Sequence, residues 1–339
     1  MLRIGVIGAG AMGQNHARLL WELSDRVNLT GVVDVIYERA SLIASKYGST
    51  PYRNYQDFLD REKPDAVVIA VPTAHHFEVA LECINRGVHI LVEKPLASTI
   101  AQAKALIEAV NKHNVKLMVG HVERFNPAVV TAKKKIEMGE LGRLILMEAR
   151  RQGPFPARIS DVGVTVDLAV HDIDIFRFIS CQEVESVFAE TARVLNGENE
   201  DLLAAVLKFT KGVVGVLNVN WLTPTKIREI YILGEKGMYY LNYLTQELVF
   251  YRNAYETSTD WESMKIFRGV SEGEMIRYPI KKYEPLRAEL ESFINVLEDK
   301  ADVPVTVEDG AITIGIAQAL LKSALHSSSI ALKEVTEPW

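Results

Sequence analysis

Short apolar runs rich in β-branched residues alternate with amphipathic stretches through the first 122 residues of this 339-residue chain. The runs lie at 4–7, 29–33, 66–71, 88–92 and 115–119, and the amphipathic stretches lie near 12–23, 36–47, 75–86 and 98–113. Strands that alternate with helices form a parallel sheet with helices on both faces. The pattern therefore predicts a doubly wound α/β domain of the Rossmann type over residues 1–122.

A second pattern begins at residue 123. The expected elements are helices at 127–138 and 168–180, a strand at 143–152, a Pro- and Gly-rich loop at 153–163, and strands near 184–194, 202–209, 213–221 and 227–233. Strands joined by tight turns, such as FTKGVV at 209–214, form antiparallel sheets. We predict an α+β domain over 123–339 with a large, open, mainly antiparallel sheet, whose last helices pack back on the first domain. Since such a sheet needs one face for its own core, the other face is expected to form a homodimer or homotetramer.

Charge and composition narrow the class of protein. The formal net charge of −6 argues against a nucleic-acid partner, which favours basic surfaces. No apolar stretch is long enough to cross a bilayer, and the N-terminus leads straight into a strand without the regions of a secretory signal. Cys83 and Cys181 lie in apolar helical patterns, so no disulfide framework is indicated. We therefore expect a cytoplasmic protein that acts on a small molecule.

A glycine-rich turn, GAGAMG at residues 8–13, follows the first predicted strand and opens a helix. Gly8 permits the tight turn, Gly10 lets the backbone approach a pyrophosphate, and Gly13 permits close helix packing. Met12 lies inside the turn and is expected to contact the same cofactor. Asp34 ends the second strand, 21 positions after Gly13 (34 − 13). A carboxylate there accepts the ribose hydroxyls and repels a 2′-phosphate, which predicts NAD rather than NADP.

Pro72 and Thr73 follow the strand at 66–71, on the carboxyl edge of the sheet where ligands bind. Both are expected to contact the cofactor, and Thr73 is also expected to cap the next helix. His76 is interpreted as a structural residue at the start of that helix.

The strand at 88–92 stops abruptly at Glu93, Lys94 and Pro95. On the ligand side of a parallel sheet, Lys94 is expected to point toward whatever lies over a nicotinamide ring, while Glu93 steadies the cofactor and Pro95 restrains the backbone. The alternative is a surface lysine at a turn.

The stretch DLAVHDID at 167–174 carries the best candidate for proton transfer. Asp167 and His171 are four positions apart and share one face of a helix, and Asp174 is three positions beyond His171. An imidazole beside a carboxylate moves protons near neutral pH. The alternative is a buried histidine satisfied by a helix neighbour. No companion cluster has convincing ligand spacing, so we expect no metal site.

These features together resemble the Gfo/Idh/MocA family of oxidoreductases across essentially the whole chain. The matching residues are the glycine turn, Glu93-Lys94-Pro95 and the pair Asp167 and His171. GHVERFNP at 120–127 resembles the family's crossing between domains, and the segments 285–297 and 305–324 resemble its closing helices.

The resemblance implies hydride transfer between a sugar or polyol carbon and NAD, with Lys94, Asp167 and His171 as the catalytic residues. His171, oriented by Asp167, would accept the hydroxyl proton, and Lys94 would stabilise the alkoxide. GHVERFNP is most similar to the UDP-N-acetylglucosamine 3-dehydrogenases of the family, which oxidise the sugar C3 hydroxyl to a ketone.

Arginines near the predicted site favour a nucleotide sugar, because guanidinium groups suit a diphosphate. Arg124 lies at the domain crossing, and Arg150, Arg151 and Arg158 surround the Pro- and Gly-rich loop. Arg150 and Arg151 point to opposite faces of a strand, so at most one of them contributes. We expect Arg124, Arg151 and Arg158 to bind substrate; solvent-facing arginines are the alternative.

Three other functions are compatible with these residues. A dehydrogenase of myo-inositol or of a free sugar needs the same chemistry, and an NAD-dependent glycosidase would oxidise C3 only transiently. A non-catalytic NAD sensor is disfavoured because Lys94, Asp167 and His171 are all retained.

Overall fold

The computed structural model describes residues 1–155, 162–195, 197–254 and 271–333. The chain divides into two compact units. Unit 1 comprises Met1–Val122 and Glu284–Gly315, and unit 2 comprises Glu123–Tyr283 and Ile316–Trp339. The segment 284–315, part of the expected second domain of 123–339, therefore belongs with unit 1. The last helix, α9 (Val307–His326), contributes to both units.

Unit 1 contains a six-stranded parallel sheet in the order β3-β2-β1-β4-β5-β6. Its strands are β1 (Leu2–Ile7), β2 (Val27–Val33), β3 (Thr50–Tyr52), β4 (Ala66–Ile69), β5 (His89–Glu93) and β6 (Leu117–Gly120). The strand order reverses between β1 and β4, and ligands bind outside the carboxyl ends at such a point. The predicted Rossmann sheet is confirmed.

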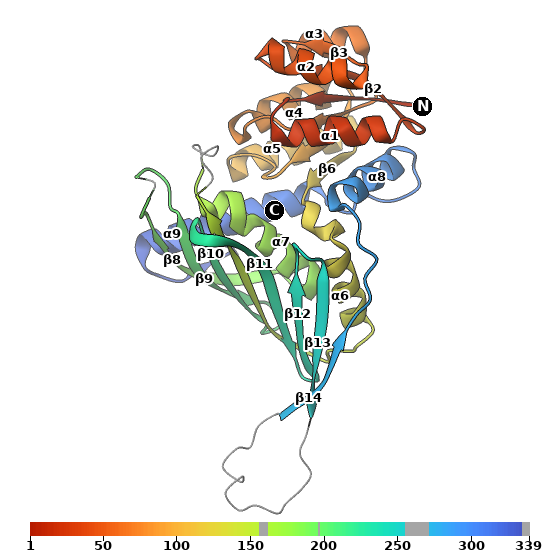
Figure 1. The fold of residues 1–339 in the computed structure, drawn as a ribbon. Helices are drawn as coiled ribbons and strands as arrows, with labels where there is room; N and C mark the ends of the chain where they lie inside the picture. The colour runs from red at the N-terminus through yellow and green to blue at the C-terminus, as the bar shows by residue number, and fades with distance from the viewer. Residues whose placement is uncertain (156–161, 196, 255–270, 334–339) are drawn as a thin grey trace, which may run out of the picture. The chain divides into compact units, whose positions relative to one another are not determined.

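Helices cover this sheet. They are α1 (Ala11–Glu22), α2 (Tyr37–Tyr47), α3 (Tyr55–Glu62), α4 (His76–Asn85), α5 (Ile100–His113) and α8 (Pro285–Leu297), with a short 3₁₀ turn, η1 (Thr73–His75), before α4. Although α8 comes from the end of the chain, it packs against α1, as Figure 1 shows. Residues of α1 and α8, which are far apart in the sequence, therefore contact each other.

The sequence pattern did not predict β3 or α3. With three residues, β3 is too short to show an alternation. Asn54 caps α3 by accepting hydrogen bonds from the amides of Gln56 and Asp57. Phe58 of α3 is fully buried on the sheet, where a Cβ atom on Gly5 or Gly31 would come within 2.1 or 2.8 Å of its ring. The two strand glycines thus make room for an aromatic side chain.

Unit 2 contains a nine-stranded sheet in the order β14-β13-β12-β11-β7-β10-β9-β8-β15. The strands are β7 (Leu144–Pro154), β8 (Val184–Ala192), β9 (Leu202–Phe209), β10 (Val214–Asn220), β11 (Leu222–Gly234), β12 (Gly237–Asn242), β13 (Glu247–Ala254), β14 (Ser271–Arg277) and β15 (Ile330–Ala331). β10 runs parallel to β7, and the other paired strands are antiparallel. The mainly antiparallel sheet is confirmed.

Helices lie against one face of this sheet (Figure 1). The 3₁₀ turn η2 (Val122–Phe125) leads into α6 (Pro127–Glu137), which packs on β12 and β13. A π-helical turn, η3 (Thr165–Ala169), continues directly into α7 (Val170–Ser180), which packs on β7. Strand β9 alternates buried and exposed side chains, so the two faces of the sheet are distinct.

Candidate active site

The glycine turn has the geometry of a phosphate cradle. Gly8 has a φ of +102°, and a Cβ atom on it would lie 2.4 Å from the carbonyl oxygen of Ala70. A Cβ atom on Gly13 would lie 1.8 Å from the carbonyl oxygen of Gly8, so α1 packs against the turn too closely for any side chain. At Gly10 a Cβ atom would meet nothing within 4 Å, and no side chain caps α1. The helix N-terminus is therefore left open to an anion, as a dinucleotide pyrophosphate requires.

Asp34 follows the end of β2 and holds the turn from the other side. Its Oδ2 accepts a hydrogen bond from the amide of Ala9, and its Oδ1 accepts one from the amide of Ile36, each at 2.8 Å. A carboxylate oxygen has a second lone pair, so both oxygens retain capacity for ribose hydroxyls. Val35 is 82% exposed and Arg39 is also exposed, so the residues after β2 form no basic pocket for a 2′-phosphate. These residues fit NAD.

His76 has the structural role that the sequence indicated. It is buried, with Nδ1 2.7 Å from the carbonyl oxygen of Pro95 and Nε2 2.9 Å from that of Val71. Burial lowers its pKa, against the two carbonyl contacts, which raise it. Thr73 does not cap α4 as expected, because it starts the 3₁₀ turn and His75 precedes the helix without a side-chain cap. Pro72 and Thr73 nevertheless lie beyond the carboxyl end of β4, on the ligand side.

Glu93 is the last residue of β5, and Lys94 follows it on the same carboxyl edge of the sheet. The Lys94–Pro95 peptide bond is cis, and Pro95 is buried whereas Lys94 is half-buried. Glu93 Oε1 lies 2.9 Å from Nε2 of the fully buried His16 of α1. Burial raises the pKa of Glu93, but the hydrogen bond to His16 and the positive charge of Lys94 lower it, and that pKa lies below its ordinary value.

Asp167 lies in the π-helical turn of unit 2, and His171 follows in the first turn of α7. Both side chains are half-buried. Glu200 anchors the start of this segment, because its side chain and its backbone carbonyl accept hydrogen bonds from the amides of Thr165 and Val164, each at 3.0 Å. A carboxylate is favourable at a helix N-terminus. The segment is thus fixed from its first residues.

The predicted substrate arginines are engaged in buried ion pairs. Arg124 is 9% exposed and binds both carboxylate oxygens of Asp174 at 2.8 and 2.6 Å. Arg151 is 4% exposed and binds both oxygens of Asp172, at 2.7 and 2.9 Å, and Glu123 at 3.1 Å. The guanidinium groups expected to bind a diphosphate are thus hydrogen-bonded to carboxylates of the protein, and Asp174 is the partner of Arg124. We therefore assign both arginines to the core of unit 2; Arg158 lies outside the described residues.

Arg228 of β11 is a cation that the sequence analysis missed. Burial and the charge of Arg151 lower its pKa to about 10, against Asp172, Glu123 and Asp167, which raise it. Its Nη1 donates to the carbonyl oxygens of Gln152 and Ile227. Side chains in a strand alternate between its faces, so the sequence IREIYIL places Arg228 on the same face as the buried Ile230 and Ile232. This alternation could have identified Arg228 as an arginine that faces the interior.

Sequence comparison identifies the two units. Residues 2–121 match the "Oxidoreductase family, NAD-binding Rossmann fold", and residues 129–240 match the "GFO/IDH/MocA C-terminal domain". The scyllo-inositol 2-dehydrogenase (NAD⁺) of Bacillus subtilis is 30% identical over 276 residues, which cover 76% of this chain and 79% of that protein. The chain belongs to the Gfo/Idh/MocA family of oxidoreductases. The resemblance seen in the sequence is thereby confirmed.

Other relatives of this protein are named for different substrates. Myo-inositol 2-dehydrogenase of Thermotoga maritima is 27% identical over 346 residues, covering 98% of this chain and 99% of that protein. UDP-N-acetylglucosamine 3-dehydrogenase of Acidithiobacillus ferrooxidans is 28% identical over 296 residues, covering 87% and 88%. The chain is thus similar to enzymes of inositols and of nucleotide sugars.

Two solved structures also resemble the chain over nearly its full length. A structure of the Acidithiobacillus ferrooxidans enzyme matches with a TM-score of 0.83 and 26% identity, over 95% of this chain and 97% of that one. The WlbA dehydrogenase from Bordetella pertussis, in complex with NADH and UDP-GlcNAcA, matches with a TM-score of 0.81 and 25% identity, over 97% and 98%. The protein is an oxidoreductase of a sugar and polyol dehydrogenase family, and its cofactor is NAD.

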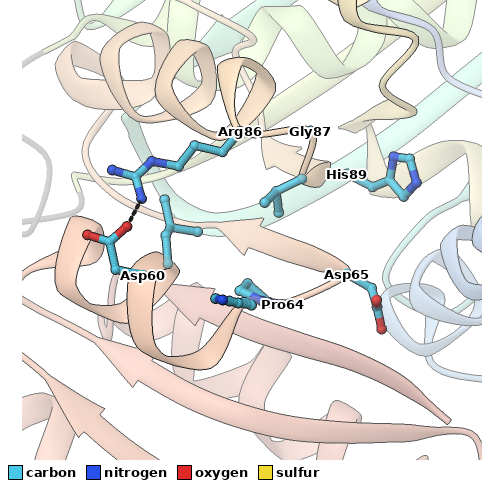
Figure 2. A pocket seen from close by; sticks show the side chains of 9 residues that line it. Asp60, Pro64, Asp65, Arg86, Gly87 and His89 are labelled. Carbon is cyan, nitrogen blue, oxygen red and sulfur yellow. Dashed lines mark hydrogen bonds and ion pairs between the residues drawn. The ribbon is translucent and has the colours of Figure 1, made fainter.

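A cavity of about 450 Å³ lies at the opposite end of the strands of unit 1. Figure 2 shows Asp65, which precedes β4, and His89, which begins β5, in its lining, with an ion pair between Asp60 and Arg86. Since the glycine turn follows the carboxyl end of β1, this cavity is not the cofactor site. Among the described residues, no cluster of three or more His, Cys, Asp or Glu is suited to a metal. No helix in the same parts of the chain has the length and apolarity of a membrane span.

Proposed function

We propose that the protein oxidises the C3 hydroxyl of a nucleotide sugar such as UDP-N-acetylglucosamine to a ketone, with NAD as the electron acceptor. The observation that carries the substrate assignment is the match to UDP-N-acetylglucosamine 3-dehydrogenase in both sequence and fold. The neighbour crystallised with NADH and UDP-GlcNAcA supports the same class of substrate.

His171 is the proposed general base. Asp167 orients its imidazole, and the anchored start of the segment restricts the movement of both. Bound NAD⁺ supplies the hydride acceptor. As the C–H bond breaks, His171 takes the hydroxyl proton and the Lys94 ammonium group stabilises the negative charge that develops on the oxygen. Acid–base assistance of this kind is typically worth about 10²–10⁴ in rate.

The nucleotide needs cations other than those first expected. Arg124 and Arg151 are bound to carboxylates, so the proposal does not depend on them for the diphosphate. Arg228 and Arg158 remain the candidates. Arg228 is half-buried, and a bound anion would restore its lowered pKa toward the ordinary range.

A polyol dehydrogenase is the second candidate. The match to myo-inositol 2-dehydrogenase spans nearly the full length of both proteins, and the burial of two expected diphosphate ligands also favours a substrate without phosphate. Myo-inositol and a sugar ring both present a secondary hydroxyl, so Lys94, Asp167 and His171 would keep their roles.

A substrate screen distinguishes these functions. Purified protein and NAD⁺ are mixed with UDP-N-acetylglucosamine, free N-acetylglucosamine or myo-inositol, and NADH absorbance and product mass are followed. NADH and a keto-sugar formed from the UDP-sugar support the proposal, whereas turnover of myo-inositol alone replaces it with the polyol function. Free sugar released without net NADH indicates a glycosidase, and NAD binding without turnover indicates a sensor.

The sheet of unit 2 supports a homo-oligomer. On its less buried face, Phe188 of β8 pairs with Val206 of β9, which pairs with Val216 of β10. Phe188 is 41% exposed and Val206 is 45% exposed. Glu148 of β7 follows Val216, and Tyr231 and Tyr240 continue the row across β11 and β12. A row that is mostly apolar is suited to contact with a second copy of the chain.

A further inference from the structure

Two buried titratable side chains, His16 and Glu289, interact with Glu93 at the end of β5. His16 of α1 lies 2.9 Å from Glu93, as described above. Glu289 of α8 is fully buried, and its charge interacts with that of Glu93. The helix α8, which carries Glu289, packs on α1, which carries His16. Neither His16 nor Glu289 has a role in the proposed mechanism.

Several polar atoms of this cluster lack hydrogen-bond partners among the described residues. They are Nδ1 of His16 and both carboxyl oxygens of Glu289. Such atoms are rare in folded proteins, because leaving one unsatisfied is costly. A neutral imidazole that donates from Nε2 to Glu93 has an acceptor at Nδ1, and a protonated carboxyl group has one O–H donor. The cluster therefore holds one acceptor without a donor and one donor without an acceptor.

The charges of the cluster agree with this pairing. Burial raises the pKa of Glu289 well above its ordinary value, and the negative charge of Glu93 raises it further, which favours the protonated form of Glu289. Glu93 is ionised, since its pKa is below the ordinary value. The other titratable groups whose charges act on Glu93 are Lys94 and His76 of α4. Of the two carboxyl groups, Glu93 is therefore the one that carries the negative charge.

We propose that Glu289 and His16 are positioning residues that form a buried hydrogen-bonded chain to Glu93. The Glu289 carboxyl group donates to one buried water molecule, which donates to His16 Nδ1, and His16 Nε2–H donates to Glu93. This hydrogen-bonded chain keeps Glu93 ionised and fixed on the cofactor side of the sheet. Its charge favours NAD⁺, whose nicotinamide ring is positive, over NADH, whose ring is neutral. The inference depends on NAD binding and not on the proposed sugar substrate.

Two substitutions of Glu289 test the proposed hydrogen-bonded chain. Glu289→Gln keeps the shape and a donor for His16 Nδ1, whereas Glu289→Leu fills a similar volume without a donor. In the leucine variant the hydrogen bond from His16 holds Glu93 less firmly, so the pKa of Glu93 rises and Glu93 loses its negative charge as the pH falls. Dissociation constants for NAD⁺ and NADH, measured without any sugar between pH 6 and 9, report this change.

We expect Glu289→Leu to lose about tenfold in NAD⁺ affinity at the acid end of this range and to recover toward the alkaline end. NADH affinity should change much less, and Glu289→Gln should follow the wild type throughout. If the two variants have the same pH profile, the hydrogen-bonded chain is wrong. Because no sugar is present, a wrong substrate assignment would leave these results unchanged.

Infrared spectroscopy tests the proton on Glu289 without relying on the leucine variant. The wild-type protein at neutral pH should show the C=O stretch of a buried carboxylic acid, and Glu289→Gln should lack it. Absence of that band from the wild type would mean that Glu289 is ionised, and this would overturn the proposal.

Discussion

Replacing Arg151 distinguishes a structural arginine from a substrate ligand. In Arg151→Met, the carboxylate of Asp172, which is 1% exposed, loses both of its guanidinium hydrogen bonds. The methionine also removes the guanidinium group that lies 5.0 Å from the centre of the Tyr243 ring. Removing one partner of a buried ion pair costs about 3–5 kcal/mol. For a unit of this size that corresponds to a decrease in Tm of roughly 6–20 °C.

Calorimetry of three variants measures this cost. Arg150→Met is the matched control, because Arg150 is the next residue of β7, on the opposite and more exposed face, and should change stability by less than about 0.5 kcal/mol. In the double variant Arg151→Met/Asp172→Leu the buried charge is gone, so much of the stability lost in Arg151→Met should return. An unchanged Tm in Arg151→Met, together with a raised KM for a UDP-sugar but not for myo-inositol, would refute the structural assignment and restore Arg151 as a substrate ligand.

Three further predictions follow from single features. Asp34→Asn removes the charge that repels a 2′-phosphate, so the preference for NAD⁺ over NADP⁺ in a binding titration should fall about tenfold; an unchanged preference would exclude Asp34 from that role. Because the pKa of folded Glu289 is raised above the ordinary 4.5, its contribution to stability is present at acid pH and is lost as pH rises. Glu289→Gln should therefore gain on the wild type by up to about 1.4 kcal/mol per pH unit above 4.5 in denaturant titrations, and a constant difference would contradict the raised pKa. Phe188→Glu with Val206→Lys should dissociate the oligomer in light scattering, and an unchanged mass would place the contact elsewhere.

The fold could be predicted wherever one physical pattern dominated. The Rossmann strands are buried on both faces, so they appear in the sequence as continuous apolar runs between amphipathic helices. Strand β9 was predicted at its observed limits because a nearly continuous apolar run leads into the tight turn FTKGVV at 209–214. Strand β12 was not predicted, because its large side chains remove the contrast in polarity between its two faces. These side chains are Met238, Tyr239, Tyr240 and Leu241.

The candidate site could be predicted only as far as local geometry decides it. The glycine turn and Asp34 act through neighbouring backbone, and spacing along the chain therefore located them. The carboxylate partners of Arg151 could not be predicted, because they depend on how β7 packs against α7. The burial of Glu289 could have been predicted, because it shares the apolar side of α8 with the buried Leu286, Leu290 and Phe293. That Glu289 reaches the neighbourhood of Glu93 depends on tertiary packing, which the sequence pattern does not show.

The role of His171 is tested most directly by single-turnover NADH formation with the productive substrate of the screen, in wild type and in His171→Asn. We predict that hydride transfer slows by about 10²–10⁴ in the variant, while its dissociation constant for NAD⁺ stays within about twofold of the wild type. A variant that forms NADH at the wild-type rate would contradict the assignment of His171 as the base.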